Sequence, residues 1–537
     1  MTEELGLDFV HDIGPMPPEK YFMPQMVGSG VAVFDFDNDG RMDLYFVQNG
    51  GPNSKSTNRL FRQTADGHFV DVSKGSGLDI TGYGMGVAIG DVNNDGWPDV
   101  LVTEYGRVRL FLNNGNGTFT DVTKEAGLEN PLWATSAAFV DYDRDGWLDL
   151  VIVNYVDYVA DRKCPGRDGT PDFCGPSAFD GRVTKLYHNR GRSAGSSSNV
   201  VRFDDVTVAS GLGRLTGPGL GVICADFNGD HWPDILIAND GKPNHLWINQ
   251  RNGTFKEEAL LRGVAYNAMG QAEANMGIAL GDVDGDGLFD LFVTHLGDEK
   301  HRLWKQGPRG QFRDQTAAAG LANPKWNGTG FGAVLVDFDH DGTLDLALVN
   351  GRVRRDKDSR PDPATIQALG PFWAQYADRN QLFTNEGGGH FRDLSPANPV
   401  FCGTPAIGRG LAYGDLHGDG AIDLVATYVG GPARIYRNVA PKRGHWLMVR
   451  ALDPALHRDA YGAEITLEAG GRRWWGMISP GSSYLCSNDP RAHFGLGPVD
   501  RLEALTIIWP DGSEETYPGG PVDRLMVARK GEGRHER

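Results

Sequence analysis

The sequence has few cysteines, no long apolar run and no excess of basic residues. Five cysteines in 537 residues are too few for a disulfide scaffold; only Cys164 and Cys174 are close in sequence, and they could form one bridge or stay reduced. No apolar run reaches about 18 residues, the length that a membrane helix needs. The formal net charge of −18 argues against a nucleic-acid partner. At 40% apolar and 10% aromatic residues, the chain can still build real cores.

Glycine is the residue in excess. The 74 glycines are about twice the usual share, and they follow no collagen-like period. This composition favours a turn-rich β protein.

One acidic pattern, first seen as "FDFDNDGRMDL" at residues 34–44, recurs seven times. Successive copies are separated by 56, 50, 85, 56, 55 and 78 residues, so a unit of about 55 residues runs through the first 440 positions. Two copies carry long insertions, at roughly residues 155–183 and 351–379. The copies begin at Asp35, Asp91, Asp141, Asp226, Asp282, Asp337 and Asp415.

Each unit contains four short apolar segments, which in the first unit read "GVAVFD", "DLYFVQNG", "NRLFRQ" and "GHFVDVS". Short runs of Val, Phe, Leu and Tyr between Asn-Gly and Asp-Gly turns predict antiparallel strands. Four strands repeated seven times predict an all-β fold, a seven-bladed β-propeller. A linear solenoid is the alternative, but β-helix repeats are much shorter. The seventh unit supplies three strands, and "GLDFVHD" at residues 6–12 is predicted to supply the fourth.

The acidic loops predict calcium binding. Side-chain oxygens occupy positions 1, 3, 5 and 9, Gly usually occupies position 6, and position 7 offers a backbone carbonyl, as in the first part of an EF-hand loop. Calcium takes six to eight oxygen ligands, so it would relieve the repulsion among crowded carboxylates. The alternative is that Asp and Gly only mark β-turns. The predicted ligands are Asp35, Asp37, Asp39, Arg41, Asp43, Asp91, Asn93, Asp95, Trp97, Asp99, Asp141, Asp143, Asp145, Trp147, Asp149, Asp226, Asn228, Asp230, Trp232, Asp234, Asp282, Asp284, Asp286, Leu288, Asp290, Asp337, Asp339, Asp341, Thr343, Asp345, Asp415, Asp419, Ala421 and Asp423.

Two loops depart from the pattern. His231 replaces Gly at position 6 of the loop at residues 226–234, and His417 stands at position 3 of the loop at residues 415–423. We expect those two sites to be weaker or empty, which gives five to seven Ca²⁺ ions. Seven ions would bring +14 to the net charge of −18 and leave −4. The role of the metal is expected to be mainly structural.

These units resemble the FG-GAP/VCBS repeats of the integrin α-chain propeller, and more specifically those of the cartilage acidic protein family. The resemblance continues after residue 440 with "RDAYGAEITLEAGG", "SPGSSYLCSNDPRAHFGLG" and "LTIIWPDGSEETY", which are similar to the ASPIC/UnbV domain. It implies a propeller at residues 1–440 and an ASPIC/UnbV-like domain at residues 441–537. Alternating apolar and polar residues in the second part independently predict a small β-sandwich.

The insertions locate a candidate binding surface. Both lie between the second and third strands of their blades, on the rim opposite the acidic loops, and long loops on a rigid scaffold often carry binding sites. The alternative is that the residues of this rim only pack the insertions onto the propeller. The predicted ligand-binding residues are Tyr83, Tyr105, Trp133, Tyr155, Asp240, His295, Arg352, Trp373, Arg409 and Tyr428.

The favoured function is a calcium-binding propeller that binds a protein or a carbohydrate through this rim. The alternative is an enzyme of secondary metabolism, of cyclase or alkylating type, acting on a small metabolite in a pocket over the channel or between the domains. No recognisable catalytic motif occurs in the sequence. A deep apolar pocket where His295, Asp240 and Arg409 converge would favour the enzyme.

The compartment stays open at this stage. The first twenty residues show no signal peptide, which would suit the cytoplasm. Calcium loops of modest affinity favour a secreted or periplasmic protein.

Overall fold

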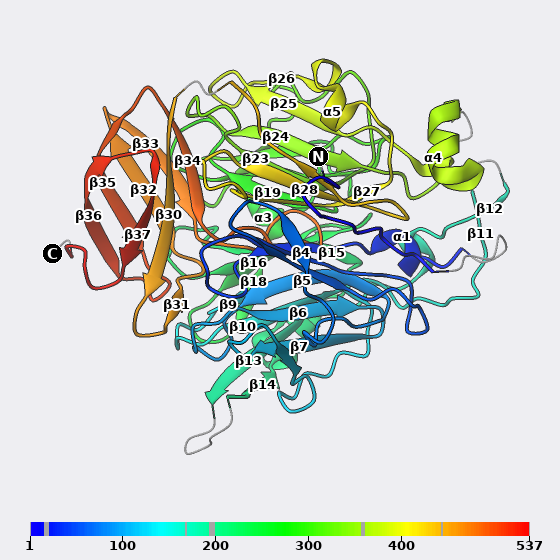
Figure 1. The fold of residues 1–537 in the computed structure, drawn as a ribbon, viewed down its shortest axis with the longest axis horizontal. Helices are drawn as coiled ribbons and strands as arrows, with labels where there is room; N and C mark the ends of the chain where they lie inside the picture. Colours follow the sequence, from blue (N-terminus) through cyan, green and yellow to red (C-terminus); the bar gives the residue numbers. More distant parts are fainter. Residues whose placement is uncertain are drawn as a thin grey trace.

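The computed structural model describes residues 2–14, 21–166, 169–192, 199–355, 360–441 and 444–535. Seven antiparallel sheets follow one another along the chain, and each is built from consecutive strands, except that β11 and β12 of the first insertion intervene in the third sheet. The first strand of every sheet contacts the first strand of the next, and β27 contacts β1, so the sheets close into a ring. The fold is the seven-bladed β-propeller that the repeats predicted (Figure 1).

The blades have these strands: β1 (Val31–Phe34), β2 (Asp43–Phe46), β3 (Arg59–Gln63) and β4 (Phe69–Asp71); β5 (Gly84–Gly90), β6 (Asp99–Glu104), β7 (Arg107–Asn113) and β8 (Phe119–Asp121); β9 (Ala134–Val140), β10 (Asp149–Asn154), β13 (Lys185–Arg192) and β14 (Val201–Asp205); β15 (Gly219–Ala225), β16 (Asp234–Asn239), β17 (His245–Asn249) and β18 (Phe255–Glu257); β19 (Ile278–Gly281), β20 (Asp290–Val293), β21 (Arg302–Gln306) and β22 (Phe312–Asp314); β23 (Gly330–Val336), β24 (Asp345–Asn350), β25 (Gln381–Asn385) and β26 (Phe391–Asp393); β27 (Gly408–Gly414), β28 (Asp423–Tyr428) and β29 (Arg434–Tyr436).

The second strands explain why the blades hold together. In β6 and β10 every residue is buried, because each blade packs a neighbour on both faces. Such strands read as nearly continuous apolar runs. Separate apolar clusters fill the spaces between neighbouring blades, and one of them joins Val31 and Val33 of the first blade to Ala412 and Val425 of the seventh.

The N-terminal segment closes the ring in a different way from the one predicted. Val10 pairs with Pro432, and Ala433 donates to the carbonyl of Phe9, so residues 9–11 run beside the start of β29. These residues lie before β29 rather than along its outer edge. Within the described residues the seventh sheet therefore has three strands, and residues 6–12 are not its fourth.

The insertions meet over the channel mouth, on the side of the propeller where Figure 1 places α1, β11, β12 and α4. Cys164 and Cys174 form a disulfide inside the first insertion. Asp172 of this insertion accepts a hydrogen bond of 2.6 Å from the hydroxyl of Tyr376 in the second. The helices are α1 (Pro24–Val27), α2 (Thr207–Ser210), α3 (Ala259–Arg262), α4 (Pro363–Trp373) and α5 (Pro399–Cys402), with 3-10 turns η1 (Pro176–Ala178), η2 (Leu212–Arg214), η3 (Ala374–Tyr376) and η4 (Ser395–Ala397); the first insertion adds the short strands β11 (Cys164–Pro165) and β12 (Pro171–Asp172).

The C-terminal strands form a sandwich of two four-stranded sheets around one apolar cluster. One sheet has the order β31-β30-β34, with β37 parallel to β30, and the other has the order β33-β32-β35-β36. The sandwich lies on the side of the propeller away from the insertions (Figure 1). The strands are β30 (His445–Asp453), β31 (Arg458–Asp459), β32 (Glu464–Ala469), β33 (Arg472–Met477), β34 (Ala492–Gly497), β35 (Arg501–Ile508), β36 (Glu514–Pro521) and β37 (Arg524–Arg529).

The connection between β33 and β34, residues 478–491, enters the propeller channel; we call it the channel segment. Ser483 exchanges backbone hydrogen bonds with Ile278 of β19, and Ser487 does so with β1. Gly30, just before β1, makes room for it, because a Cβ there would lie 2.3 Å from the carbonyl oxygen of Leu485. The channel is therefore occupied by the chain itself.

A search of the described helices for one that is long and apolar enough to cross a membrane finds none.

Candidate functional site

Each acidic loop folds back on its own first aspartate. Asp35 accepts hydrogen bonds from the backbone amides of Asp39 (3.0 Å) and Gly40 (2.9 Å). The ninth residue, Asp43, accepts from Phe36 at 3.1 Å and from Gln63 of β3 at 2.7 Å. The same contacts recur in the second loop, where Asp91 and Asp99 take these two parts. The first and ninth positions thus shape the loop and tie it to the blade.

Two left-handed residues in each loop make this fold possible. Position 4 and position 6 have positive φ in all seven loops, and position 6 is Gly in six of them. In the fourth loop His231 adopts φ 66°, a conformation that costs a residue with a Cβ about 1–2 kcal/mol. The sequence prediction of strain at this position agrees with the observed backbone.

Replacing His231 with Gly is expected to raise the free energy of unfolding by about 1 kcal/mol, because glycine takes this backbone conformation without the Cβ clash. Urea unfolding at a fixed calcium concentration measures the change. His231→Ala is the matched control, since it removes the imidazole and keeps the Cβ. An equal gain in both variants would place the cost in the imidazole, which lies 3.9 Å from Asp226, and not in the backbone.

The third position supplies carboxylate oxygens that lack a partner. The Oδ1 atoms of Asp37, Asp143 and Asp284 are buried, and none of them has a hydrogen-bond partner among the described residues. In the first, third, fifth and sixth loops, three carboxylates or two carboxylates and a His place ligand atoms within 4.8 Å of one another. Buried, unpaired carboxylate oxygens are the feature expected of ligands for a hard cation.

Burial also raises the pKa values in these loops. It raises the pKa of Asp43 and of Asp290 to about 8, against the lowering effect of their backbone donors. Burial raises the pKa of Asp337 to about 8 as well, and nearby carboxylates add to the effect. The side chains of the protein therefore do not supply enough positive charge to keep these groups ionised at their usual pH.

Histidines lie beside the acidic side chains of two further loops. His417, at position 3 of the seventh loop, lies 2.6 Å from the Oδ2 of Asp423 through its Nδ1. In the third loop His188 comes from β13 and lies 3.1 Å from Asp149 and 3.3 Å from Asp143. The sequence identified the first of these histidines but not the second, because His188 lies outside the loop.

The C-terminal sandwich covers the acidic loops. Arg458 is buried and donates to the side chain of Asn94 (2.8 Å) and to the carbonyl of Gly146 (3.2 Å), so it bridges the second and third loops. The amide of Gly497 donates to the carbonyl of His340 in the sixth loop at 3.0 Å. The acidic rim is therefore an interface between the two parts of the chain, which the sequence did not predict.

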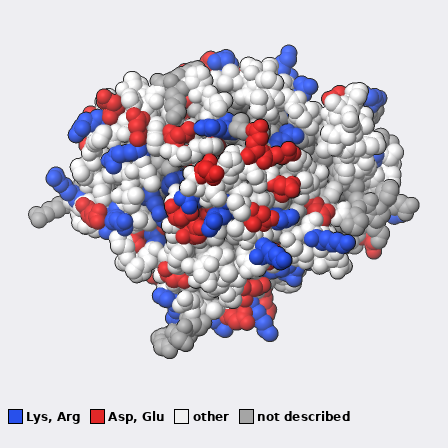
Figure 2. Space-filling view, in the orientation of Figure 1, with Lys and Arg blue, Asp and Glu red and all other residues white. Residues whose placement is uncertain are grey.

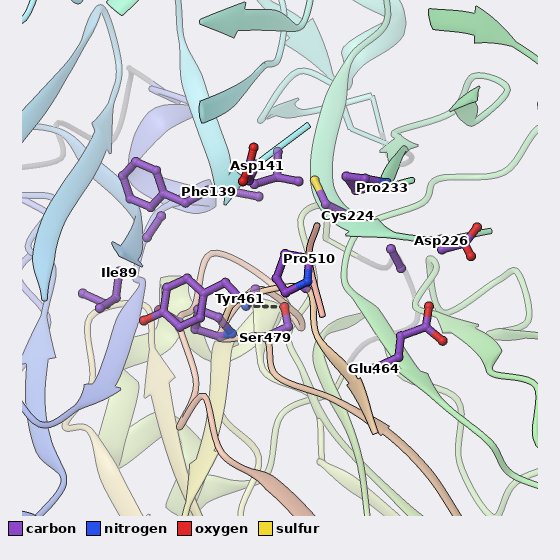
Figure 3. Close-up of a pocket in the computed structure, with 18 of the residues that line it drawn as sticks. Ile89, Phe139, Asp141, Cys224, Asp226, Pro233, Tyr461, Glu464, Ser479 and Pro510 are labelled. Atoms are coloured by element: carbon purple, nitrogen blue, oxygen red, sulfur yellow. Dashed lines mark hydrogen bonds between the residues drawn. The ribbon is translucent and has the colours of Figure 1, made fainter. Parts of the chain in front are cut away.

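A small cavity lies in this interface. Its volume is about 50 Å³, and Figure 3 shows Cys224, Tyr461 and Ser479 around it, with Asp141 and Asp226 from two acidic loops. Binding sites for small molecules usually measure about 300–1,000 Å³. The cavity is of a size for a few water molecules and not for a metabolite.

The residues predicted to bind a ligand separate into three groups. Tyr83, Tyr105, Trp133 and Tyr155 form one aromatic cluster, with the rings of Trp133 and Tyr155 5.1 Å apart. Tyr155 donates a hydrogen bond of 2.5 Å to Asp240. Trp373 stacks on Phe173, which joins the two insertions. These contacts pack the insertions and the N-terminal segment onto the propeller.

Three further residues of that set are buried. Arg409 is fully buried over the ring of Phe331 and donates to the backbone carbonyls of Met26, Gly351, Gly408 and Arg352. His295 is fully buried between Val293 and Asn275, and burial holds its pKa well below the usual range. Tyr428 is buried beside Asn380. Each is held by its own structural partners, and Asp240, His295 and Arg409 are not shown to converge on one pocket.

Arg352 differs from the others, because it lines an open pocket of about 360 Å³ on the insertion rim. It is paired with Asp378 at 2.9 Å. The pocket also contains Arg354, Arg355, Asp298 and Asn327, which sequence reasoning missed because these residues stand in no repeat. Elsewhere, acidic and basic side chains are intermixed on the face drawn in Figure 2, so the acidic excess forms no continuous patch there.

The fold and the loops together define a class, a β-propeller whose blades repeat an acidic loop. The family described as "FG-GAP-like repeat" matches residues 35–102, 91–152, 226–293 and 282–348. The family described as "ASPIC and UnbV" matches residues 453–535. The chain therefore belongs to the proteins that combine FG-GAP-like repeats with a C-terminal ASPIC/UnbV domain, which confirms the resemblance drawn from the sequence.

Curated relatives agree with this assignment. Cartilage acidic protein 1 of Mus musculus is 28% identical over 388 residues, which are 63% of this chain and 58% of the relative. The Homo sapiens protein of the same name is 27% identical over 330 residues, 59% of this chain and 44% of the relative. The chain thus spans about half the length of these relatives.

Two solved structures show weak similarity to this chain. A structure from work on recognition of non-reducing terminal N-acetylglucosamine by an Agrocybe aegerita lectin has a TM-score of 0.38 and 14% identity, over 78% of this chain and 92% of that one. A structure of YCF48 bound to D1 peptide has a TM-score of 0.41 and 8% identity, over 80% and 97%. Scores this low add nothing to the fold, which the sheets of the chain itself define.

Proposed function

We propose that this chain is a calcium-stabilised propeller that serves as a binding protein. The FG-GAP propeller supports the binding role. One observation supports the calcium: Asp37, Asp143 and Asp284 at the third position are partly buried, and each has a buried Oδ1 atom without a hydrogen-bond partner among the described residues, beside other carboxylates. Leaving such groups buried without a partner costs free energy, and a divalent cation would remove that cost.

The residues present fit calcium better than other metals. In the first loop Asp35, Asp37, Asp39 and Asp43 would offer carboxylate oxygens, and Arg41 its carbonyl. Magnesium demands a stricter octahedral geometry, and zinc prefers His and Cys ligands. When bound, the ion would supply positive charge under the C-terminal sandwich, where Arg458 already lies between two loops.

Calorimetric titration of metal-stripped protein tests this proposal. We expect five to seven equivalents of Ca²⁺ to bind, because five loops are regular and two have a histidine at position 3 or position 6. Asp37→Ala should remove one equivalent, and His417→Asp, which restores the third-position carboxylate, should complete a site in the seventh loop. Asp66→Ala is the control, since Asp66 is an exposed acid outside the loops. Equal stoichiometry in Asp37→Ala and Asp66→Ala would contradict the assignment.

The insertion rim is the proposed binding surface, because it is the rim that the C-terminal sandwich leaves uncovered. The 360 Å³ pocket there is lined by three arginines and two aspartates. Such a lining suits a polar ligand, a protein segment or a carbohydrate, more than an apolar metabolite. The channel gives the enzyme alternative no support, because the channel segment fills it. Between the two parts of the chain, the cavity around Tyr461 measures about 50 Å³, and a second, open pocket beside Asp284, Trp475 and His493 measures about 410 Å³.

A peptide and glycan array probed with the intact protein tests this surface. We expect hits that Arg354→Ala weakens at least about tenfold, the effect of losing one well-placed charged hydrogen bond. Arg313→Ala, a change in β22 away from the rim, should leave them unchanged. Hits that survive Arg354→Ala would move the surface elsewhere.

A further inference from the structure

The seventh blade carries an apolar groove where the other blades carry a fourth strand. The groove measures about 710 Å³ and runs along the outer edge of β29. Val439 and Val400, which also line it, are 78% and 75% exposed. The floor of the groove is made by Phe338, Leu382, Ile422, Leu424, Ile435 and Tyr436.

The six complete blades show what fits such a groove. Each fourth strand carries a buried phenylalanine that packs on the previous blade: Phe36 lies 6.2 Å from Phe119, and Phe227 lies 5.9 Å from Phe312. Phe338 holds the same loop position in the sixth blade as Phe36 does in the first, but it is only partly buried. The six phenylalanines are Phe69, Phe119, Phe203, Phe255, Phe312 and Phe391.

The backbone frame for a fourth strand is already in place. Asn438 donates its amide to Asp423 (2.7 Å) and its side chain to the carbonyl of Phe338 (2.8 Å). Asn113 makes both of these bonds in the second blade, each at 2.8 Å, and there it leads into the hairpin with β8. By this register Asn438 would face the incoming phenylalanine, as Asn113 faces Phe119.

The charged residues beside the groove also correspond to those of the complete blades. The fourth strands carry an acid two residues after the phenylalanine, and a base on the third strand pairs with it: Lys185 lies 3.1 Å from Asp205, and Arg302 lies 3.4 Å from Asp314. Arg434 has the corresponding place on β29 and lines the groove. There its guanidinium rests on the ring of Tyr428 at 4.9 Å.

We propose that this groove binds an extended segment of a partner protein, with the pattern Phe-x-Asp or Phe-x-Glu, as the fourth strand of the seventh blade. The segment would run antiparallel to β29, with its phenylalanine against Phe338 and Ile435 and its acid beside Arg434. Backbone pairing gives affinity in such strand addition, and the side-chain pockets give specificity. The proposal concerns a surface separate from the insertion rim and the acidic loops.

The test uses a labelled peptide with the sequence of residues 116–122, Asn-Gly-Thr-Phe-Thr-Asp-Val, and fluorescence anisotropy with the full chain. We expect saturable binding, and at least about tenfold weaker binding when the peptide carries Phe119→Ala, the effect of losing one buried aromatic ring. Arg434→Glu should weaken the binding, and a peptide with Asp121→Lys should restore it. Restored binding in this charge exchange would show that the Arg434→Glu chain is folded.

Three outcomes would overturn the proposal. The first is no binding at a peptide concentration of about 1 mM. The second is equal binding of the Phe119→Ala peptide, which would indicate unspecific apolar contact. The third is retained binding by a chain with residues 116–122 attached directly before Thr2, where they should fill the groove: the Oγ1 of Thr2 accepts from Ile435 at 3.1 Å, as that of Thr123 accepts from Leu110 at 2.9 Å.

Discussion

Removal of divalent ions with EGTA is expected to lower the melting temperature of this protein by about 15 °C. At a calcium concentration one hundred times the dissociation constant, each site adds about 2.7 kcal/mol, so five regular loops add about 13 kcal/mol. An entropy of unfolding near 2.1 cal/mol/K per residue gives about 0.9 kcal/mol/K for the propeller, which converts that energy into the stated shift. Differential scanning calorimetry with and without chelator measures it.

Specificity for the metal is part of the same expectation. Readdition of Ca²⁺ should restore the transition, whereas an equal concentration of Mg²⁺ should restore little of it, because the loops crowd more oxygens than an octahedral ion accepts. The C-terminal sandwich should also become easier to cleave from the propeller after chelation, since it rests on the loops through Arg458 and Gly497. A melting temperature that EGTA leaves unchanged would refute the calcium proposal.

Tyr484→Ala is expected to cost about 3–5 kcal/mol of unfolding free energy, the range for truncating a fully buried aromatic side chain. Tyr484 is 0% exposed at the centre of the channel, where its ring lies 4.8 Å from Phe331. Around it the channel segment holds two strained residues, Ser483 at φ 72° and Leu485 at φ 59°. Without the ring, the packing contacts that hold Ser483 and Leu485 in their strained conformations would be lost. Urea unfolding followed by tryptophan fluorescence gives the change.

Tyr484→Phe is the matched control. It keeps the ring and removes only the hydroxyl, which donates to the carbonyl of Val27 at 3.2 Å, so it should cost about 1 kcal/mol. In limited proteolysis Tyr484→Ala should release the C-terminal sandwich earlier than Tyr484→Phe. Equal stability of the two variants would show that the channel segment does not anchor the sandwich.

The predictions for EGTA and for Tyr484→Ala both concern the interface between the propeller and the C-terminal sandwich. The sandwich touches the loops of several blades and sends the channel segment between their first strands. The proposed calcium ions would therefore act on the rim of the same interface that the channel segment contacts at its centre. The insertion rim and the groove at β29 lie outside this interface.

The repeats made the propeller predictable. Each blade is a local structure whose strands, turns and glycines lie within about 55 residues, so the pattern of one unit determines the shape of that unit. The acidic loops were equally readable, because the residues from Asp35 to Asp43 that fold around one point are nine neighbours in sequence. The left-handed backbone at His231 followed from its alignment with six glycines.

The surfaces were not predictable in the same way. The sequence suggested Arg409 and His295 as ligand-binding residues, and that assignment stays untested, but the structure places both in buried networks with backbone and amide partners. It also suggested that residues 6–12 form the last strand, and the structure places them beside the start of β29 instead. The residue types on the insertion rim did not indicate which of these side chains the folded protein would bury.

The sequence by itself determined the class of fold, the number of blades and the composition of the acidic loops, since all three depend on contacts between near neighbours. Only the tertiary structure decided that the sandwich covers those loops, that the channel segment fills the channel and that one blade is left with an open edge. These features depend on contacts such as that of Arg458 with Asn94, which are separated by hundreds of residues and follow no period. Such long-range contacts form only where the surfaces of the folded parts are complementary, and a local sequence pattern does not reveal that complementarity.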